Sequence, residues 1–298
     1  MNGLGSIGAA AAQWLMEPLQ QVFLQRALGL GLLVAAVCAL LSCYLTLKGW
    51  ALMGDAISHA VLPGVVLAHL VGAPYAAGAF LFGVGSVTVI GWLRRHTRVR
   101  EDSLIGLVFT GFFALGLVLI SKLRSGVDLS HILFGNLLGL NDGDIQQTVA
   151  IGVVVLLVLL LRRRDLLLFC FDPGHARSIG LRTGWLHTLL LGLVSLATVA
   201  ALQAVGIILV VAMLVTPGAT AFLLTDRFDR MNLYAVALAM LATALGVIVS
   251  YWLDASTAGC IVLVQTGLFL LTMLLAPRHG LLAQRRRRAG GLPPSPPP

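Results

Sequence analysis

The sequence predicts an all-α, polytopic membrane protein with about nine transmembrane helices. Of its 298 residues, 58% are hydrophobic and only 11% are charged, against roughly 25% charged residues in soluble domains. Several stretches approach the length of about 20 apolar residues that a membrane span needs. These two observations exclude a soluble globular protein.

The spans are expected to be helices, because lipid offers backbone groups no partner and the chain lacks the alternating pattern of a membrane barrel. The segment 51–71 contains charge, and two other spans follow each other closely, so eight spans remain an alternative. The expected spans are 27–47, 51–71, 75–93, 103–121, 145–161, 185–202, 205–225, 231–253 and 257–276.

Orientation follows from the basic residues, which stay on the cytoplasmic side when they lie in short loops. An outside N-terminus and a cytoplasmic C-terminus place 17 of the 20 Lys and Arg residues inside. Only Arg26, Lys122 and Arg124 then lie outside. Because the net charge of +8 is spread over loops, it does not indicate nucleic-acid binding.

Three regions are expected along the chain. Residues 1–26 form an N-terminal interfacial segment, and residues 27–277 form the transmembrane domain. Residues 278–298 form a basic, proline-rich cytoplasmic tail that is disordered and contacts anionic membrane lipid. The four cysteines show neither a disulfide framework nor metal-ligand spacing.

Asp55 is the one acidic residue within a hydrophobic segment, and an ionisable residue in a span indicates a functional site. His59 follows four residues later and shares its helix face. A carboxylate and an imidazole suit a first-row divalent cation. Two copies of the chain related by a two-fold axis would supply four ligands, which favours a homodimer. The alternative is an Asp–His pair that only satisfies itself between packed helices.

Pro63 and Gly64 are expected to break the helix at this site, because proline has no N–H to give to the carbonyl of residue 59. His69 lies on a similar face of the same span and is a candidate outer waystation for the metal. His187 falls at a span edge, where an interfacial role is expected.

The loop between the fifth and sixth spans predicts a short, capped helix. Asp172 is a good N-cap, Pro173 suits the first helical position, and Gly180 suits the C-terminal stop. Such a helix can transmit force to a docked partner, although an ordinary connecting turn is the alternative. Pro217–Gly218 in the seventh span indicates either a flexible point or the general tolerance of membrane helices for proline.

The chain contains no GxxxxGK[ST] motif, so any ATP dependence requires a partner. Three segments of the chain form a distinctive set. They are GDAISHAVLPGVVLA at 54–68, DPxxAxxxG at 172–180, and AVGIILVVAMLVTPGATAFLLTDRF at 204–228. Together they resemble the manganese/zinc/iron-type ABC transporter permease family. The resemblance extends from about Trp14 to Pro277.

The resemblance implies a multi-pass subunit of the bacterial cytoplasmic (inner) membrane that imports Mn²⁺, Fe²⁺ or Zn²⁺ as a homodimer. A cytoplasmic ABC ATPase and an extracytoplasmic metal-binding protein are the implied partners, with no permanently bound cofactor and no enzymatic activity of its own. It also implies that Asp55 and His59 are the translocation ligands, and that Asp172, Pro173, Ala176 and Gly180 belong to the ATPase-coupling segment. The SHAVLPG motif resembles the manganese and iron branch of the family more than the zinc branch.

The sequence is also compatible with three other functions. A proton-coupled secondary transporter would use the Asp55–His59 pair without an ATPase. A non-transporting scaffold would need the pair only for stability. An ABC permease for a siderophore or a vitamin would need room for a larger cargo than two small side chains suggest.

Overall fold

The computed structural model describes residues 17, 20–122 and 142–276, and every regular element in these ranges is a helix. The predicted all-α, multi-pass fold is confirmed, with nine stretches in the described ranges long and apolar enough to cross a membrane. The helices of these stretches are α2 (Val22–Lys48), α3 (Ala51–Ala60), α4 (Leu62–Val71), α5 (Tyr75–His96), α6 (Glu101–Lys122), α8 (Asp142–Leu161), α11 (Thr183–Val205), α12 (Ile207–Leu224), α13 (Phe228–Leu253) and α14 (Thr257–Leu275).

The structure differs from the expected elements in three places. Helix α2 begins at Val22, so the first span starts within the segment expected to lie at the interface. The second span consists of two short helices, α3 and α4, that meet at Val61, two residues before the break expected at Pro63 and Gly64. A further helix, α9 (Arg163–Phe171), precedes the short α10 (Pro173–Ser178). The predicted C-terminal tail, 278–298, and most of the N-terminal segment lie outside the described residues.

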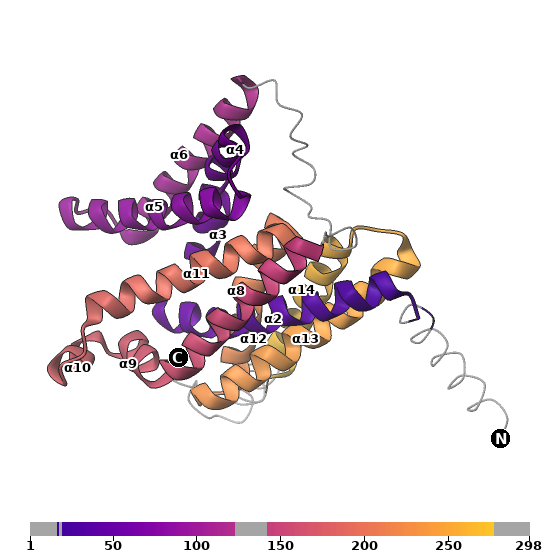
Figure 1. Ribbon diagram of the computed structural model, residues 1–298. Helices are drawn as coiled ribbons and strands as arrows, with labels where there is room; N and C mark the ends of the chain where they lie inside the picture. Colours follow the sequence, from indigo (N-terminus) through magenta and orange to yellow (C-terminus); the bar gives the residue numbers. More distant parts are fainter. Residues whose placement is uncertain (1–16, 18–19, 123–141, 277–298) are drawn as a thin grey trace, which may run out of the picture.

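Helix α2 lies at the centre of the larger part of the molecule. It packs most extensively against α12 and α13, and α14 packs on both of these helices (Figure 1). Helices α8 and α11 pack against each other and against α2. Small residues allow close approach at these contacts, as at Gly246 of α13, where a Cβ would overlap Ile261 of α14.

Helices α4, α5 and α6 form a second group (Figure 1), in which α5 packs directly on α11 of the larger part. Helix α3 joins the two groups, because it packs on α12 and α11 on one side and on α6 and α5 on the other. The helix that carries Asp55 and His59 therefore lies at the junction of the two groups.

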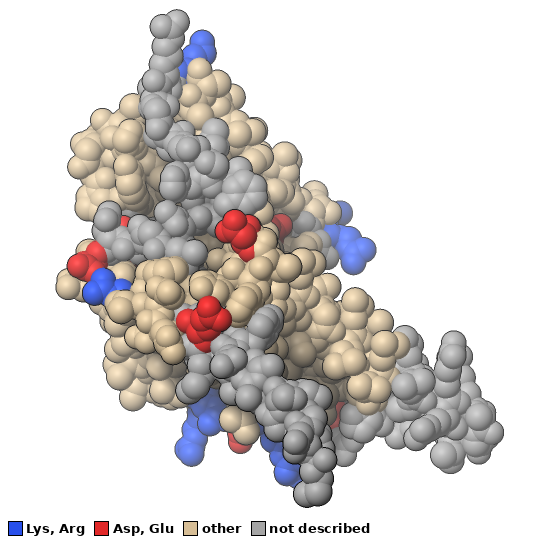
Figure 2. All heavy atoms as spheres, turned by 90° about the vertical axis from the view of Figure 1, so that its right-hand side faces the viewer, with Lys and Arg blue, Asp and Glu red and all other residues tan. Residues whose placement is uncertain are grey.

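The two ends of the helix bundle differ in charge. The starts of α2 and α8 meet at one end, where Arg26 pairs with Asp142 at 3.2 Å. Figure 2 faces this end and shows acidic groups near its centre, with basic groups at the edges. Most described Lys and Arg residues lie at the opposite end, together with α9 and α10. The prediction that α10 is cytoplasmic rests on this distribution of Lys and Arg residues.

Candidate functional site

Asp55 and His59 lie one turn apart on α3 and face each other. The Oδ1 atom of Asp55 is 3.4 Å from Nε2 of His59. This separation is longer than an ordinary N–H···O hydrogen bond of about 2.7–3.2 Å. The side chains are 34% and 21% exposed, respectively. The pair is therefore close and partly shielded, yet still open on one side.

Two aromatic rings of α6 frame the imidazole of His59. Phe109 and Phe113 meet it edge to face, with ring centroids 4.7 and 5.2 Å away. The Nδ1 atom of His59 is buried and has no hydrogen-bond partner among the described residues. The two phenylalanines hold the ring on its apolar sides and leave Nε2 directed toward Asp55.

The second span is interrupted directly after His59. Helix α3 ends at Ala60, α4 begins at Leu62, and Pro63 stands in the first turn of α4. Because proline has no N–H, the carbonyl of His59 loses its usual donor four residues later. The interruption places a polar backbone atom at the level of the imidazole.

Gly64 serves close packing rather than the interruption alone. A Cβ at Gly64 would overlap the backbone carbonyl of Gly78 on α5, and a Cβ at Gly78 would overlap the carbonyl of Gly64. The two helices therefore touch through their backbones. Pro63 and Gly64 thus have separate roles, since Pro63 removes a donor and Gly64 admits α5.

His69, the expected waystation, lies near the end of α4 on the far side of the interruption. Its side chain is exposed, and its Nδ1 atom is 2.8 Å from the hydroxyl of Tyr75. The two rings also stack, with centroids 5.8 Å apart. The structure brings His69 to Tyr75 at the end of the span, and Asp55 and His59 form a separate pair on α3.

The predicted short helix at 172–180 is present as α10. Asp172 is its N-cap, and Oδ1 of this residue accepts hydrogen bonds from the amides of Gly174 and His175, both at 2.9 Å. Pro173 occupies the first helical position, and Ala176 is fully buried. Gly180 adopts a φ of +88°, a conformation that L side chains rarely take. The local structure predicted for this segment is confirmed.

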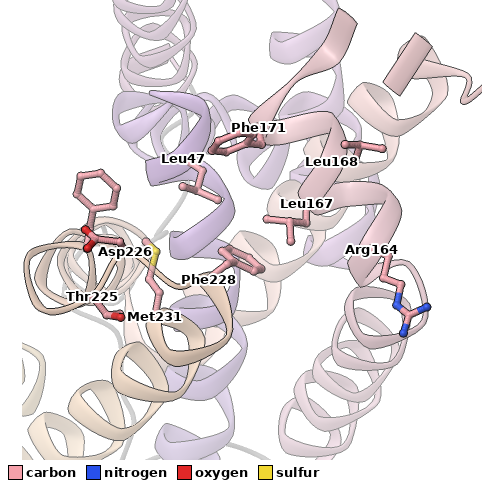
Figure 3. A pocket seen from close by; sticks show the side chains of 10 residues that line it. Leu47, Arg164, Leu167, Leu168, Phe171, Thr225, Asp226, Phe228 and Met231 are labelled. Carbon is pink, nitrogen blue, oxygen red and sulfur yellow. The ribbon is translucent and has the colours of Figure 1, made fainter. Parts of the chain in front are cut away.

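An apolar cavity of about 400 Å³ lies beside this segment (Figure 3). Helix α9 supplies Leu167, Leu168 and Phe171, and the turn from α12 to α13 supplies the opposite wall. Arg164 and Asp226 lie at opposite ends of the cavity (Figure 3). Phe171, next to the start of α10, is 79% exposed.

Pro217 lies inside α12, which continues as one helix from Ile207 to Leu224. Gly218 packs against the backbone of Ser42 on α2, so the proline position is buried between two spans. The described residues contain no group of three or more His, Cys, Asp or Glu side chains that could hold a metal. Asp55 and His59 therefore offer two donors from one chain.

Sequence reasoning missed the residues that hold the pair in place. Phe109, Phe113 and Gly78 lie in apolar runs and have no polar group to mark them. Their roles depend on which helices pack against α3 and α4. A small residue at Gly78 was the single local signal, and it is too common in membrane helices to be diagnostic.

Known membrane transport proteins are similar to this chain over most of its length. The family model described as the ABC 3 transport family matches residues 20–276. The chain is 57% identical over 278 residues to the manganese transport system membrane protein MntB of Synechocystis, covering 93% of this chain and 91% of that protein. It is 49% identical over 258 residues to the chelated iron transport system membrane protein YfeD of Yersinia pestis, covering 87% of each.

A solved structure shares the fold. PsaBC from Streptococcus pneumoniae, determined in complex with a Fab, superposes with a TM-score of 0.83 at 35% sequence identity. The match covers 94% of this chain and 99% of that chain. With nine apolar stretches in the part of the chain that the structure describes, the protein is a multi-pass membrane permease of the bacterial inner membrane that belongs to the ABC 3 transport family.

Proposed function

We propose that the chain is the membrane permease subunit of an ATP-driven bacterial importer of divalent transition-metal ions. Manganese is the first candidate cargo, with iron and zinc as further candidates. The observation that carries the proposal is the Asp55–His59 pair beside the interruption of the second span. Relatives whose names state manganese or chelated iron transport support a metal cargo.

The geometry of the pair suits a shared cation better than a mutual hydrogen bond. Zinc bonds to carboxylate oxygen and imidazole nitrogen are about 2.0–2.2 Å long, and the tetrahedral angle of a zinc site separates the two donor atoms by about 3.4 Å. Asp55 Oδ1 and His59 Nε2 are 3.4 Å apart. Asp55 would also compensate the charge of the ion within the membrane.

Two donors from one chain leave a first-row cation with too few ligands. A second copy of the chain, related by a two-fold axis next to α3, would bring another Asp55 and His59. The ion would then cross the membrane on the axis of a homodimer. The partial exposure of both side chains leaves one side of the pair available for this contact.

Energy would come from a separate ATPase, because the chain has no phosphate-binding motif of its own. Helix α10, with its side-chain cap and its exposed neighbour Phe171, is the candidate coupling segment. An extracytoplasmic metal-binding protein would deliver the ion at the opposite end. The permease itself holds no permanent cofactor and carries the metal as substrate.

The test is uptake of radioactive Mn²⁺ by cells that express the chain with its ATPase and binding protein. Asp55→Asn and His59→Gln are compared with the wild type at matched membrane levels. Asp144→Asn is the matched control, because Asp144 is half-buried in the first turn of α8, on a different helix from the pair. We expect both site variants to lose uptake and the control to retain it. Competition with Zn²⁺ and Fe²⁺ then orders the cargos.

Normal uptake by both site variants would contradict the metal site and leave a structural pair. A proton-coupled transporter makes the opposite energetic prediction. Its uptake would stop with a protonophore and continue after ATP depletion, whereas ATP-driven uptake would stop when ATP is depleted.

A further inference from the structure

A second cavity, of about 640 Å³, lies at the end of the molecule that carries α10. It is separate from the Asp55–His59 pair, and its walls come from the ends of α2 and α5, from α9 and α10, and from the start of α11. Figure 1 shows the ends of α5 and α11 diverging beside α10. The cavity therefore opens where the membrane surface would meet these helices.

The cavity is strongly basic. Four cationic side chains line it, and no acidic side chain is among the described residues that do so. The cationic residues are Lys48, Arg94, Arg95 and Arg177. Such a wall repels a divalent cation, so the cavity is unsuited to the metal path and suited to an anion.

The start of α11 adds to the positive potential. Thr183 and Gly184, the first two residues of this 23-residue helix, line the cavity. The N-cap residue, Arg182, makes no side-chain capping bond to them. Backbone N–H groups at such a helix start favour phosphate, as do arginine guanidinium groups.

An apolar groove continues from the basic cavity along α5 and α11. Gly91, Arg95, His187 and Thr188 line both spaces, so the two adjoin. The groove has a volume of about 480 Å³ and runs from Arg95 to Phe80. Phe80 and Arg95 are 15 positions apart on α5, which corresponds to about 22 Å of helix, and one half of the hydrocarbon core is about 15 Å deep.

A basic cavity joined to an apolar groove that is long enough to cross one leaflet matches one kind of ligand. We propose that the two spaces together bind an anionic phospholipid. The headgroup phosphate lies among Arg94, Arg95 and Arg177, and one acyl chain lies between α5 and α11. Trp92, which lines the groove and is 58% exposed, stands at the membrane interface as tryptophan commonly does. Because Pro173 and Arg177 of α10 line the cavity, the lipid joins α5 to α10.

The test uses the full chain, purified in detergent, delipidated and titrated with phosphatidylglycerol or with zwitterionic phosphatidylcholine. Native mass spectrometry counts the lipids retained. We expect one tightly held phosphatidylglycerol per chain and weak retention of phosphatidylcholine. Arg95→Gln with Arg177→Gln removes two charges, worth about 1 kcal/mol each at a membrane surface. The affinity for phosphatidylglycerol should fall about thirtyfold.

Matched variants separate the headgroup and acyl contributions. Arg227→Gln with Arg230→Gln removes two charges at the start of α13, outside both spaces, and should leave binding unchanged. Gly91→Leu places a side chain at the junction, where a Cβ would meet open space, and should abolish retention. Gly192→Leu fills the groove from its α11 wall and is the second blocking variant. Gly111→Leu on α6, also in open space, is their control.

Three results would overturn the proposal. Equal retention of the two lipids would show that charge does not select the ligand. Equal loss of binding in the Arg227/Arg230 control would show general surface electrostatics. Displacement of phosphatidylglycerol by inorganic phosphate, with Gly91→Leu and Gly192→Leu binding normally, would show a site for a soluble anion. None of these measurements depends on metal transport, so they are independent of the proposed function.

Discussion

The hydroxyl of Ser42 on α2 accepts a 2.9 Å hydrogen bond from the amide of Gly218 on α12, directly after Pro217. The same hydroxyl donates to the carbonyl of Val215 at 3.2 Å. Pro217 has no N–H to give to the carbonyl of Met213 four residues earlier, and the hydroxyl of Ser42 adds two hydrogen bonds to backbone groups on either side of the proline. The region of α12 around Pro217 is thus hydrogen-bonded to α2, the central helix of the molecule.

Replacing Ser42 by alanine should destabilise the protein, because it removes both hydrogen bonds that its hydroxyl makes to the backbone of α12. Hydrogen bonds between membrane helices contribute about 0.6–2 kcal/mol, and the expected loss lies in this range. Thermal unfolding in detergent measures it. Thr266→Val is the control, since the hydroxyl of Thr266 bonds to Val262 within its own exposed helix turn. Equal shifts for the two variants would contradict the role of Ser42.

The backbone contact between Gly64 and Gly78 predicts that either Gly→Ala change is strongly destabilising. The added Cβ meets backbone carbonyl atoms, which cannot move aside as a flexible side chain would. Overpacking of this kind costs about 1–3 kcal/mol or more. Gly85→Ala on the same α5 meets nothing within 4 Å and should be neutral or slightly stabilising. A melting temperature for Gly64→Ala equal to that of Gly85→Ala would show that the helices can separate freely.

The N-cap of α10 predicts a graded series at Asp172. Asp172→Ala removes the acceptor for two amides and costs about 1 kcal/mol of local stability. Asp172→Ser keeps a capping oxygen and should behave like the wild type. If α10 couples the permease to an ATPase, metal-stimulated ATP hydrolysis by the assembled transporter should fall in the alanine variant only. Equal loss in the serine variant would indicate that the carboxylate itself contacts the partner.

Cys170 on α9 should resist alkylation in the folded protein. Burial raises the pKa of its thiol to about 12, while the nearby Lys48 ammonium acts in the opposite direction. At pH 8 only roughly one thiol in ten thousand is then the reactive thiolate. N-ethylmaleimide labelling followed by peptide mass spectrometry should detect modification after unfolding in detergent and very little before it. Rapid labelling of the native protein at pH 8 would show that α9 opens.

The linear pattern of the chain determined the helical spans and the capped helix α10. Apolar runs of span length must form helices in lipid, because their backbone groups can be hydrogen-bonded only within the segment. The cap at Asp172 and the turn at Gly180 depend on neighbours within a few residues, which sequence displays directly. Asp55 and His59 could be paired in advance because i and i+4 positions adjoin on any helix.

The tertiary structure decided what surrounds these local features. Phe109 and Phe113 reach His59 from another span, Gly78 reaches Gly64 from the next helix, and Ser42 reaches the backbone beside Pro217 of α12. The basic cavity likewise gathers residues from five helices, although its arginines read in sequence only as loop charges. Hydropathy fixes which segments enter the membrane, but close packing of particular side chains fixes which helices touch. Which helices touch depends on the shapes of their surfaces in three dimensions, and the periodicity of the sequence does not reveal these shapes.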